Sequence, residues 1–456
     1  MLVLLLALTG QAGPAADPWL GQLVMLRSDG LRIEVSVASG PPKQVALDSN
    51  AVYRVLSADG ERLLLREKGQ DGWLPKTGAV LVKEAPAFFA ELIREHPTVG
   101  KYYGRRATAH QNVRRNDNML ALGDTPAGAD LSAALSDLSE AVRLEPGVAK
   151  WWGDRAWVRL QLQRWDAARA DAAEAVRLEP TRADWRLRRG LALEGAREFD
   201  LALHDYDEAI RLNPKLPEAW SARGDLLLVA KKEYKRAVTD YTAAIRLAPT
   251  VAVFPDNRGI AYARLGEYDN ALADHTRATE LDPHRAGPYY RRGDVYRWQR
   301  MWAKAVAEYS QAIEREPKEV WHLAGRGRAY LGLGDHERAR ADLRAAAGIE
   351  PTHPEAQASL AWFLSVCPED RYRDGKAAVE SARSALGKQP FEQRYHRILA
   401  AALAEAGDST AALTTQELAL KQARAEVAPH AETISKAERQ LSRYRAGKPF
   451  RDTGDE

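Results

Sequence analysis

The stretch Ala209-Ile-Arg-Leu-Asn-Pro214 decides the fold, because close copies of it recur along the chain. Each copy is an alanine followed by a short, mostly apolar run that stops at a proline. Successive prolines lie 34 or 35 residues apart. The closing prolines are Pro146, Pro180, Pro214, Pro249, Pro283, Pro317 and Pro351. Self-similarity at a fixed period of this length is typical of a protein that stacks one supersecondary unit many times.

Small residues recur inside each copy. When the closing proline is counted as position 32, alanine fills positions 20 and 27 in the six copies that end between Pro180 and Pro351. Position 8 holds Ala156, Gly190, Gly224, Gly259, Gly293 and Gly327. Two helices that cross closely need a small residue at the contact, and proline ends a helix. The copies therefore predict helix–turn–helix units, with Gly266 and Gly334 suited to the turn.

This pattern resembles the tetratricopeptide repeat, which has small residues at positions 8, 20 and 27, aromatic residues at 11 and 24, and proline at 32. Position 24 is Tyr206, Tyr241 and Tyr309 in three of the copies. The resemblance implies a mainly α solenoid of about eight to nine helix–turn–helix repeats. It also implies a concave face, lined by the first helix of each repeat, that holds peptides or partner proteins.

Two charged positions depart from the family pattern in a consistent way. Position 7, usually leucine in the family, is Arg155, Arg189, Arg223, Arg258, Arg292 and Arg326. Position 23 is Asp171, Asp205, Asp240, Asp274, Glu308 and Asp342. On antiparallel helices these positions lie at about the same height, so we expect an ion pair within each repeat. Two independently solvated faces are the alternative.

The N-terminal region follows a different pattern. The apolar run Met1–Leu8 and the small residues Gly10 and Ala12 after it predict a signal peptide over residues 1–16, with export to the periplasm or the exterior. The alternative is a buried strand in a cytoplasmic protein. Residues 17–83 alternate with a period of two, and Asp59-Gly60 is a hairpin signal. We expect a small all-β barrel, similar to bacterial Src-homology-3-like domains. Its aromatic residues Tyr53, Trp73 and Trp19 either pack in the core or contact a ligand such as cell-wall material.

The remaining segments complete the expected domain order. They are a capping helix at 84–97, a first repeat with an insertion (112–130) at 98–146, six repeats at 147–351, two divergent repeats at 352–425, and a C-terminal capping helix and frayed tail at 426–456.

The chain carries no pattern typical of catalysis. The 66 basic and 63 acidic residues are interspersed, so no footprint for nucleic acid is present. The single cysteine, Cys367, excludes an internal disulfide, and it is either buried or a reactive thiol. No histidine pair has helical metal-ligand spacing, and no phosphate loop or nucleophile motif is found. We expect no catalytic residue, no cofactor and no metal site.

Candidate partner-binding residues come from the first-helix positions that line the groove in the family, which are 2, 5, 9, 12 and 13. The aromatic and arginine side chains there are of the types enriched at binding hot spots. The candidates are Trp157, Tyr290, Asp294, Arg297, Trp298, Trp321 and Arg328. The alternative is that these are ordinary amphipathic helix faces. The lysine–asparagine set that clamps a C-terminal carboxylate in some relatives is not reproduced.

Three functions agree with these patterns. The first is a non-catalytic scaffold that binds a peptide or partner protein on the concave face. The second is a cell-envelope module that contacts cell-wall polymer through residues 17–83 and uses the array as a spacer. The third is an accessory subunit of an enzyme complex.

Overall fold

The computed structural model describes residues 22–29, 31–35, 43–48, 51–59, 61–67, 70–112, 130–390, 392–425 and 431–451. The chain divides into two compact units, Met1–Lys232 and Glu233–Glu456. Residues 1–16, Trp19 and most of the 112–130 insertion lie outside the described residues, so the signal peptide and export stay predictions. None of the helices in the described ranges has the length and apolar character needed to cross a bilayer.

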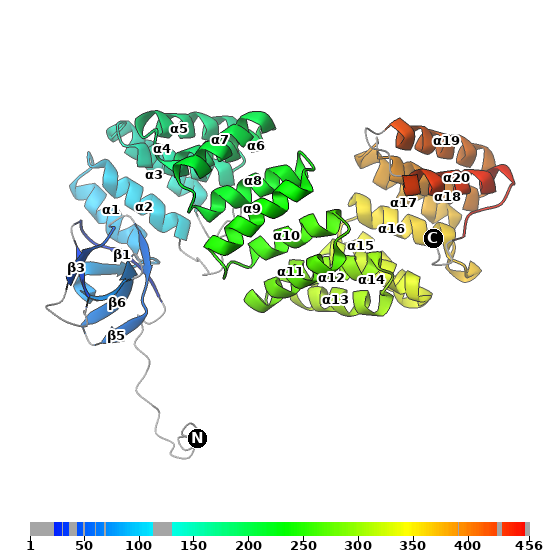
Figure 1. Ribbon diagram of the computed structural model, residues 1–456, viewed down its shortest axis with the longest axis horizontal. Helices are drawn as coiled ribbons and strands as arrows, with labels where there is room; N and C mark the ends of the chain where they lie inside the picture. The colour runs from blue at the N-terminus through cyan, green and yellow to red at the C-terminus, as the bar shows by residue number, and fades with distance from the viewer. Residues whose placement is uncertain are drawn as a thin grey trace, which may run out of the picture. The chain divides into compact units, whose positions relative to one another are not determined.

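The first unit begins with short antiparallel strands (Figure 1). They are β1 (Leu23–Leu26), β2 (Arg32–Val35), β3 (Lys43–Ala46), β4 (Val52–Arg54), β5 (Ser57–Asp59), β6 (Arg62–Glu67), β7 (Gln70–Pro75) and β8 (Ala79–Leu81). One sheet has the order β4-β1-β8 and the other β3-β2-β7-β6-β5. The all-β N-terminal region and the hairpin at Asp59 are therefore confirmed. Over the described residues, however, the strands form two sheets and no closed barrel, and the likeness to Src-homology-3 domains stays a prediction.

The core of the strand region decides between core packing and ligand contact for Tyr53. Alternating side chains of the strands, such as Ile33, Leu63 and Leu65, are fully buried. Tyr53 is buried with them, and its hydroxyl accepts from the Asp48 amide at 2.7 Å. Trp73 is half-buried, with the Arg62 guanidinium 5.1 Å from its ring centre. Tyr53 is therefore a core residue.

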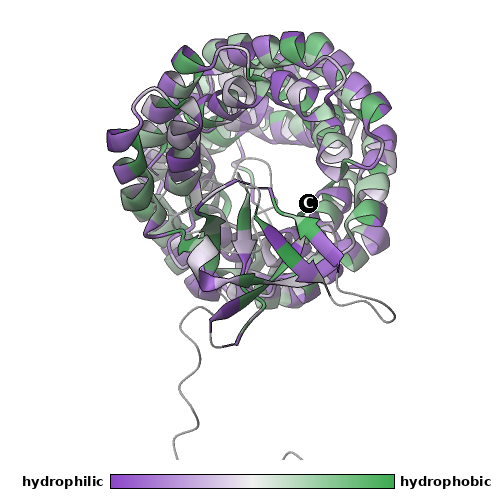
Figure 2. Cartoon of the chain, turned by 90° about the vertical axis from the view of Figure 1, so that its left-hand side faces the viewer, coloured by the Kyte–Doolittle hydropathy of each residue, from purple (hydrophilic) through white to green (hydrophobic). Residues whose placement is uncertain are grey.

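Helices follow the strands in the first unit and form the described part of the second unit. The first unit contains α1 (Ala85–Glu95), α2 (Gly100–Asn112), α3 (Leu131–Leu144), α4 (Ala149–Gln161), α5 (Trp165–Leu178), α6 (Ala183–Gly195), α7 (Phe199–Leu212) and α8 (Pro217–Val229). The second contains α9 (Tyr234–Leu247), α10 (Val253–Arg264), α11 (Tyr268–Leu281), α12 (Ala286–Trp298), α13 (Trp302–Arg315), α14 (Val320–Leu333), α15 (His336–Ile349), α16 (Pro354–Val366), α17 (Gly375–Lys388), α18 (Gln393–Glu405), α19 (Ser409–Ala425) and α20 (Ala431–Arg445). The helices that can be seen in Figure 2 carry both hydrophobic and hydrophilic residues, as amphipathic packing requires.

The small residues allow paired helices to approach closely. The alanines at positions 20 and 27, such as Ala168 and Ala175, are fully buried. A Cβ added to Gly190 would lie 2.6 Å from the ring of Tyr206, and one added to Gly293 would lie 2.9 Å from the ring of Tyr309. In these two repeats position 8 is therefore small because the aromatic ring at position 24 packs against it, and at Gly327 the side chain in that place is Leu343, 2.8 Å from an added Cβ.

The turns between paired helices share one backbone conformation. At position 15, φ is positive at Gln163, Arg197, Lys232, Gly266, Arg300 and Gly334. Only two of these residues are glycine, the residue that adopts this conformation without steric cost. The turn geometry therefore persists where the sequence carries an unfavourable residue.

The expected ion pairs between positions 7 and 23 are present inside each unit. Arg155 and Asp171, Arg189 and Asp205, Arg258 and Asp274, Arg292 and Glu308, and Arg326 and Asp342 each pair with closest N–O distances of 2.6 to 2.7 Å. Arg106 and Asp137 extend the series to the first repeat, at 2.6 Å. Arg223 and Asp240 belong to different units, and their pair stays a prediction.

The arginines of this series also join neighbouring repeats. Arg258, Arg292 and Arg326 each donate to a hydroxyl on the second helix of the preceding repeat, at 3.0, 3.1 and 3.2 Å. The acceptors are Thr242, Thr276 and Ser310. One guanidinium thus connects three helices, which explains why arginine replaces the leucine that the family usually has.

Candidate functional site

Three first helices each carry a carboxylate that contacts the side chain at position 24 of the same repeat. The Tyr206 hydroxyl donates to Glu194 at 2.6 Å, and the Tyr309 hydroxyl donates to Asp294 at 2.6 Å. His275 replaces tyrosine at this position, and its Nδ1 lies 2.9 Å from Asp256. These three carboxylates lie on α6, α12 and α10, so a core ring fixes a polar group on the first helix in each case.

A pocket of about 370 Å³ lies on the first helices of the first unit and is called the acidic pocket below. The indoles of Trp157 on α4 and Trp165 on α5 line it, together with Glu194 on α6 and Asp225 on α8. Burial raises the pKa of Glu194, although its hydrogen bond from Tyr206 acts in the opposite direction. Two carboxylates and two indoles line this pocket, and no basic residue does. The pocket is therefore suited to a cationic side chain.

A second pocket of about 250 Å³ lies entirely in the second unit and is called the basic pocket. It is lined by five cationic side chains and a single carboxylate, which are Arg297, Arg328, Arg394, Arg397, Lys436 and Glu355. Leu331, Trp362, Ile398 and Phe450 supply apolar wall. The cationic groups come from α12, α14, α18 and α20, so folding brings together residues far apart in the sequence.

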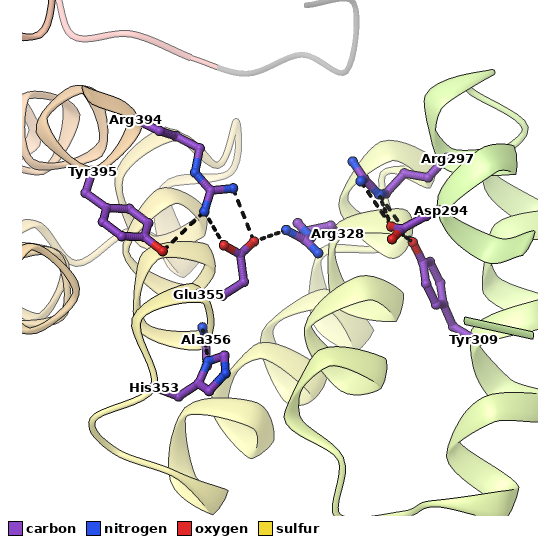
Figure 3. A network of polar contacts seen from close by, with 9 residues as sticks. All are labelled: Asp294, Arg297, Tyr309, Arg328, His353, Glu355, Ala356, Arg394 and Tyr395. Carbon is purple, nitrogen blue, oxygen red and sulfur yellow. Dashed lines mark hydrogen bonds and ion pairs between the residues drawn. The ribbon is translucent and has the colours of Figure 1, made fainter. Parts of the chain in front are cut away.

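Glu355 lies between two arginines of the basic pocket (Figure 3). Its carboxylate accepts from Arg328 on one side and from Arg394 on the other, and Arg394 also donates to the Tyr395 hydroxyl at 3.3 Å. Burial alone would raise the pKa of Glu355, but the two guanidinium groups outweigh it and hold that pKa below its ordinary value. The carboxylate therefore stays ionised and fixes both arginines at the pocket.

Asp294 fixes Arg297 in the way that Glu355 fixes Arg328 and Arg394. Besides the Tyr309 hydroxyl, it accepts from Arg297 Nη2 at 3.1 Å (Figure 3). Burial, with the charge of Asp294, raises the pKa of Tyr309 well above its ordinary range, so this hydroxyl stays a donor. The position of Arg297 is thus set by a carboxylate that is itself set by a buried ring.

The predicted partner-binding residues fall into four places. Trp157 lines the acidic pocket, and Arg297 and Arg328 line the basic pocket. Tyr290 and Asp294 lie behind the basic pocket, with Tyr290 packed 5.7 Å from the ring of Tyr309. Trp298 and Trp321 are exposed and line neither pocket: Trp298 lies 6.3 Å from the ring of Tyr268, and Trp321 packs edge-on against His353.

The sequence interpretation found only Arg297 and Arg328 in the basic pocket and missed its other three cationic residues. Arg394 and Arg397 occupy positions 2 and 5 of the last repeat, so the same counting rule, applied to that repeat, could have found them. Lys436 and Phe450 follow the last repeat, and no period places them. Phe450 is buried, 5.7 Å from the ring of Trp362, and Arg451 pairs with Glu405 at 2.8 Å. The expected fraying is therefore wrong for Phe450 and Arg451.

Neither a metal cluster nor an activated cysteine is found in the described part of the chain. No group of three or more histidine, cysteine, aspartate or glutamate residues there could hold a metal ion. Cys367 is buried at the end of α16, and this burial raises the pKa of its thiol. Because the thiolate is the reactive form, Cys367 acts as a small core residue.

The geometry defines a solenoid of helical hairpins whose first helices carry two polar pockets. Family profiles agree with this class: the tetratricopeptide repeat matches residues 187–252 and 290–354, and a second profile of the same repeat matches residues 256–285. The array contains tetratricopeptide repeats. Such repeats generally serve as scaffolds for protein–protein interactions and are typically not catalytic.

Several solved structures are similar to parts of the chain. The Cut9–Hcn1 assembly of the APC/C is 14% identical, covers 70% of this chain and 59% of its own, and has a TM-score of 0.49. YrrB, described as a tetratricopeptide protein with an unusual peptide-binding site, is 23% identical, covers 41% of this chain and 95% of its own, and has a TM-score of 0.34. PilF of Pseudomonas aeruginosa is 16% identical, and the match covers 46% of this chain and 95% of PilF, with a TM-score of 0.41. A comparison with curated protein sequences gave no match.

Proposed function

We propose that the protein is a non-catalytic scaffold that binds a peptide segment of a partner protein on the first helices of its repeats. One observation carries the proposal: both pockets are lined mainly by the first-helix positions 2, 5, 9, 12 and 13. In the acidic pocket these are Trp157, Gln161, Leu191, Glu194 and Asp225, among others. In the basic pocket they include Arg297, Arg328, Glu355, Trp362 and Arg394.

The energetics of the pockets support binding rather than structural filling. A helix face that only packs against its neighbour buries apolar side chains and leaves charges in solvent. Here, neighbouring side chains hold several charged groups in partly buried positions: Tyr206 holds Glu194 in the acidic pocket, and Glu355 holds Arg328 and Arg394 in the basic pocket. These groups line open volumes of about 370 and 250 Å³. Fixed, partly desolvated polar groups cost little ordering entropy when a ligand arrives, which is the basis of preorganised binding.

Contact with cell-wall polymer through residues 17–83 has less support. Of the aromatic residues expected to make it, Tyr53 is in the core and Trp73 is half-buried beneath Arg62, while Trp19 lies outside the described residues. No feature of the described residues favours an accessory role in one particular enzyme complex.

The test is a random peptide library displayed against the full chain, followed by affinity measurement with recovered peptides. Trp157→Ala removes an indole from the acidic pocket. Trp152→Ala is the matched control, because Trp152 is also on α4 but bonds to the Pro146 carbonyl, outside the pocket. We expect peptides that need the acidic pocket to bind Trp157→Ala at least tenfold more weakly and the control unchanged.

Two results would count against the proposal. One is recovery of no peptide by the folded wild-type chain. The other is a set of peptides whose affinity is unchanged both by Trp157→Ala and by substitutions in the basic pocket.

A further inference from the structure

The acidic pocket contains a carboxylate that has no cationic partner. Glu194 is half-buried on α6, and its contact is the Tyr206 hydroxyl at 2.6 Å, a neutral donor. In the described part of the chain, no arginine, lysine or histidine pairs with Glu194. Asp225 also lines the pocket but already interacts with other residues of the chain, so Glu194 alone is counted as an unneutralised charge.

Comparable carboxylates in other repeats do have a cationic partner. Asp256 and Asp294 each contact a ring at position 24, as Glu194 does. Arg291 pairs with Asp256, and Arg297 pairs with Asp294 at 3.1 Å. Glu194 has no such pair, and burial raises its pKa. A partly desolvated carboxylate without a counter-charge is unfavourable, and a cationic ligand would remove that cost.

The other lining groups offer a hydrogen-bond acceptor and aromatic faces. Oε1 of Gln161 on α4 is buried and accepts no hydrogen bond from the described residues. The indoles of Trp157 and Trp165 line the same pocket. A Cβ on Gly195 would lie 2.4 Å from the Trp165 ring, so the glycine lets this indole lie directly against α6. The pocket therefore combines an unneutralised carboxylate, an unused acceptor and two aromatic rings.

Arg188 on α6 lies near the pocket but does not supply the missing charge. Its guanidinium carbon is 5.9 Å from the ring centre of Trp157. The guanidinium pairs with Asp154 at 2.9 Å, and Lys150 contacts the same carboxylate. Arg188 does not line the pocket and makes no ion pair with Glu194, so the counter-charge has to come from a ligand.

The lining groups favour a guanidinium as that ligand. A guanidinium is always charged, presents five N–H donors in one plane and stacks on aromatic faces. A lysine ammonium is a more strongly hydrated point charge that stacks less well, and a quaternary ammonium has no donor for an amide oxygen. The volume of about 370 Å³ admits one long side chain and no secondary-structure element.

We infer that the acidic pocket binds an arginine side chain of the partner peptide, which pairs with Glu194, donates to Gln161 and stacks on the indoles. This inference rests on the proposed function, because it names the chemistry that one of the two pockets recognises. It requires a positive charge and a planar donor group together, and the two requirements can be tested separately.

The experiment uses the full chain and three degenerate peptide libraries that differ at one fixed position. That position is arginine, citrulline or lysine. Citrulline keeps the length and planar end of arginine without its charge, whereas lysine keeps the charge without the plane. N-acetyl-arginine amide is a second probe, measured by its shift of the melting temperature against N-acetyl-citrulline amide at equal ionic strength.

Two variants remove single features of the pocket. Glu194→Gln removes the charge and keeps an acceptor for the Tyr206 hydroxyl. Gln161→Met removes the amide oxygen at similar side-chain length, and it leaves no donor unpaired because that oxygen accepts no hydrogen bond from the described residues. Glu174→Gln is the matched control, because Glu174 lies on α5 outside the pocket and pairs with Arg177. If Glu194→Gln fails to fold, Gln161→Met carries the test.

We expect the wild type and the control to retain the arginine library at least tenfold more than the citrulline library and at least threefold more than the lysine library. Glu194→Gln should lose at least tenfold in arginine retention and Gln161→Met at least threefold, with citrulline retention unchanged. N-acetyl-arginine amide should raise the melting temperature of the wild type more than that of either pocket variant.

Equal retention of arginine and citrulline, or of arginine and lysine, would overturn the inference. So would a folded Glu194→Gln variant that retains the arginine library as the wild type does. If the three libraries bind equally and Trp157→Ala weakens them all, the scaffold function stands and only the arginine inference fails.

Discussion

Nδ1 of His275 lies 2.9 Å from Oδ1 of Asp256, and both side chains are almost completely buried in the second unit. Arg291, about one-third exposed, contacts the other oxygen of the same carboxylate. His275 stands where Tyr206 and Tyr309 stand in other repeats, and a Cβ on Gly259 would lie 2.7 Å from its ring. An imidazole, which can reach Asp256 on the first helix, therefore replaces a tyrosine without a change in the helix packing.

This pair makes the second unit sensitive to acid. Burial would raise the pKa of Asp256, but Arg291 and His275 hold it below its ordinary value. A carboxyl group with a lowered folded-state pKa stabilises the fold above its unfolded pKa, near 3.9, and this contribution is lost as the pH falls through the folded value. We expect Asp256→Asn to cost about 3 kcal/mol at pH 7 and the difference from wild type to shrink below about pH 4.

Urea unfolding at a series of pH values measures this difference. Asp269→Asn on α11, an exposed first-turn aspartate of the same unit, is the control and should stay within about 0.5 kcal/mol at pH 7. A difference between wild type and Asp256→Asn that does not change between pH 7 and pH 3 would contradict the assignment.

The turn residues at position 15 give a second prediction. Arg197 and Arg300 have φ of 64° and 58°, whereas Gly334 has 76° in the corresponding turn. A non-glycine residue with positive φ costs about 1–2 kcal/mol of steric strain, and a glycine there costs about 0.5–1 kcal/mol of extra chain entropy on folding. We expect Arg197→Gly and Arg300→Gly each to stabilise the chain by about 0.5–1 kcal/mol, which thermal unfolding can detect.

Two alanine substitutions in one hairpin control for the general effect of removing glycine. Gly334→Ala should destabilise the chain because φ is positive there. Gly348→Ala should stabilise it by about 1 kcal/mol, because Gly348 lies in α15 and an added Cβ would meet no atom within 4 Å. Shifts of the same sign for both would contradict the strain argument.

The repeat core could be predicted because the same packing constraint recurs in successive copies of the repeat. A helix crossing requires a small residue at Gly293 and at Gly190 alike, so the requirement emerges from comparing copies. The charged pair Arg326–Asp342 was predictable for the same reason. The sheet region offers no such repetition, and the alternation of apolar residues fixes which side chains are buried but not whether the sheets close.

The basic pocket was only partly predictable, for a different physical reason. Arg297 and Arg328 follow the repeat pattern, so position alone directs them to the first-helix face. Lys436 and Phe450 lie beyond the last repeat, and where they pack depends on how α20 and the chain after it fold back on α16 and α18. Such long-range packing leaves no periodic signal in the sequence.

The third prediction concerns the ion pair of Arg326 and Asp342. Arg326 donates through Nε and Nη2 to the two carboxylate oxygens at 2.7 and 2.9 Å, and both side chains are mostly buried. Removing one partner leaves the other charge buried without compensation. We therefore expect Arg326→Leu and Asp342→Leu each to cost about 3 kcal/mol.

The double variant separates an interaction from two independent effects. The double variant leaves neither charge buried without a partner, so Arg326→Leu with Asp342→Leu should cost about 3–5 kcal/mol, less than the roughly 6 kcal/mol of the two single changes added together. Urea unfolding of the four proteins should give a coupling energy of about 1–3 kcal/mol. The exposed pair Arg277–Glu280 is the control, and its coupling should not exceed about 0.5 kcal/mol. The same pair recurs at Arg155–Asp171 and Arg258–Asp274, so a coupling near zero at Arg326 would contradict a stabilising role for the recurring ion pair.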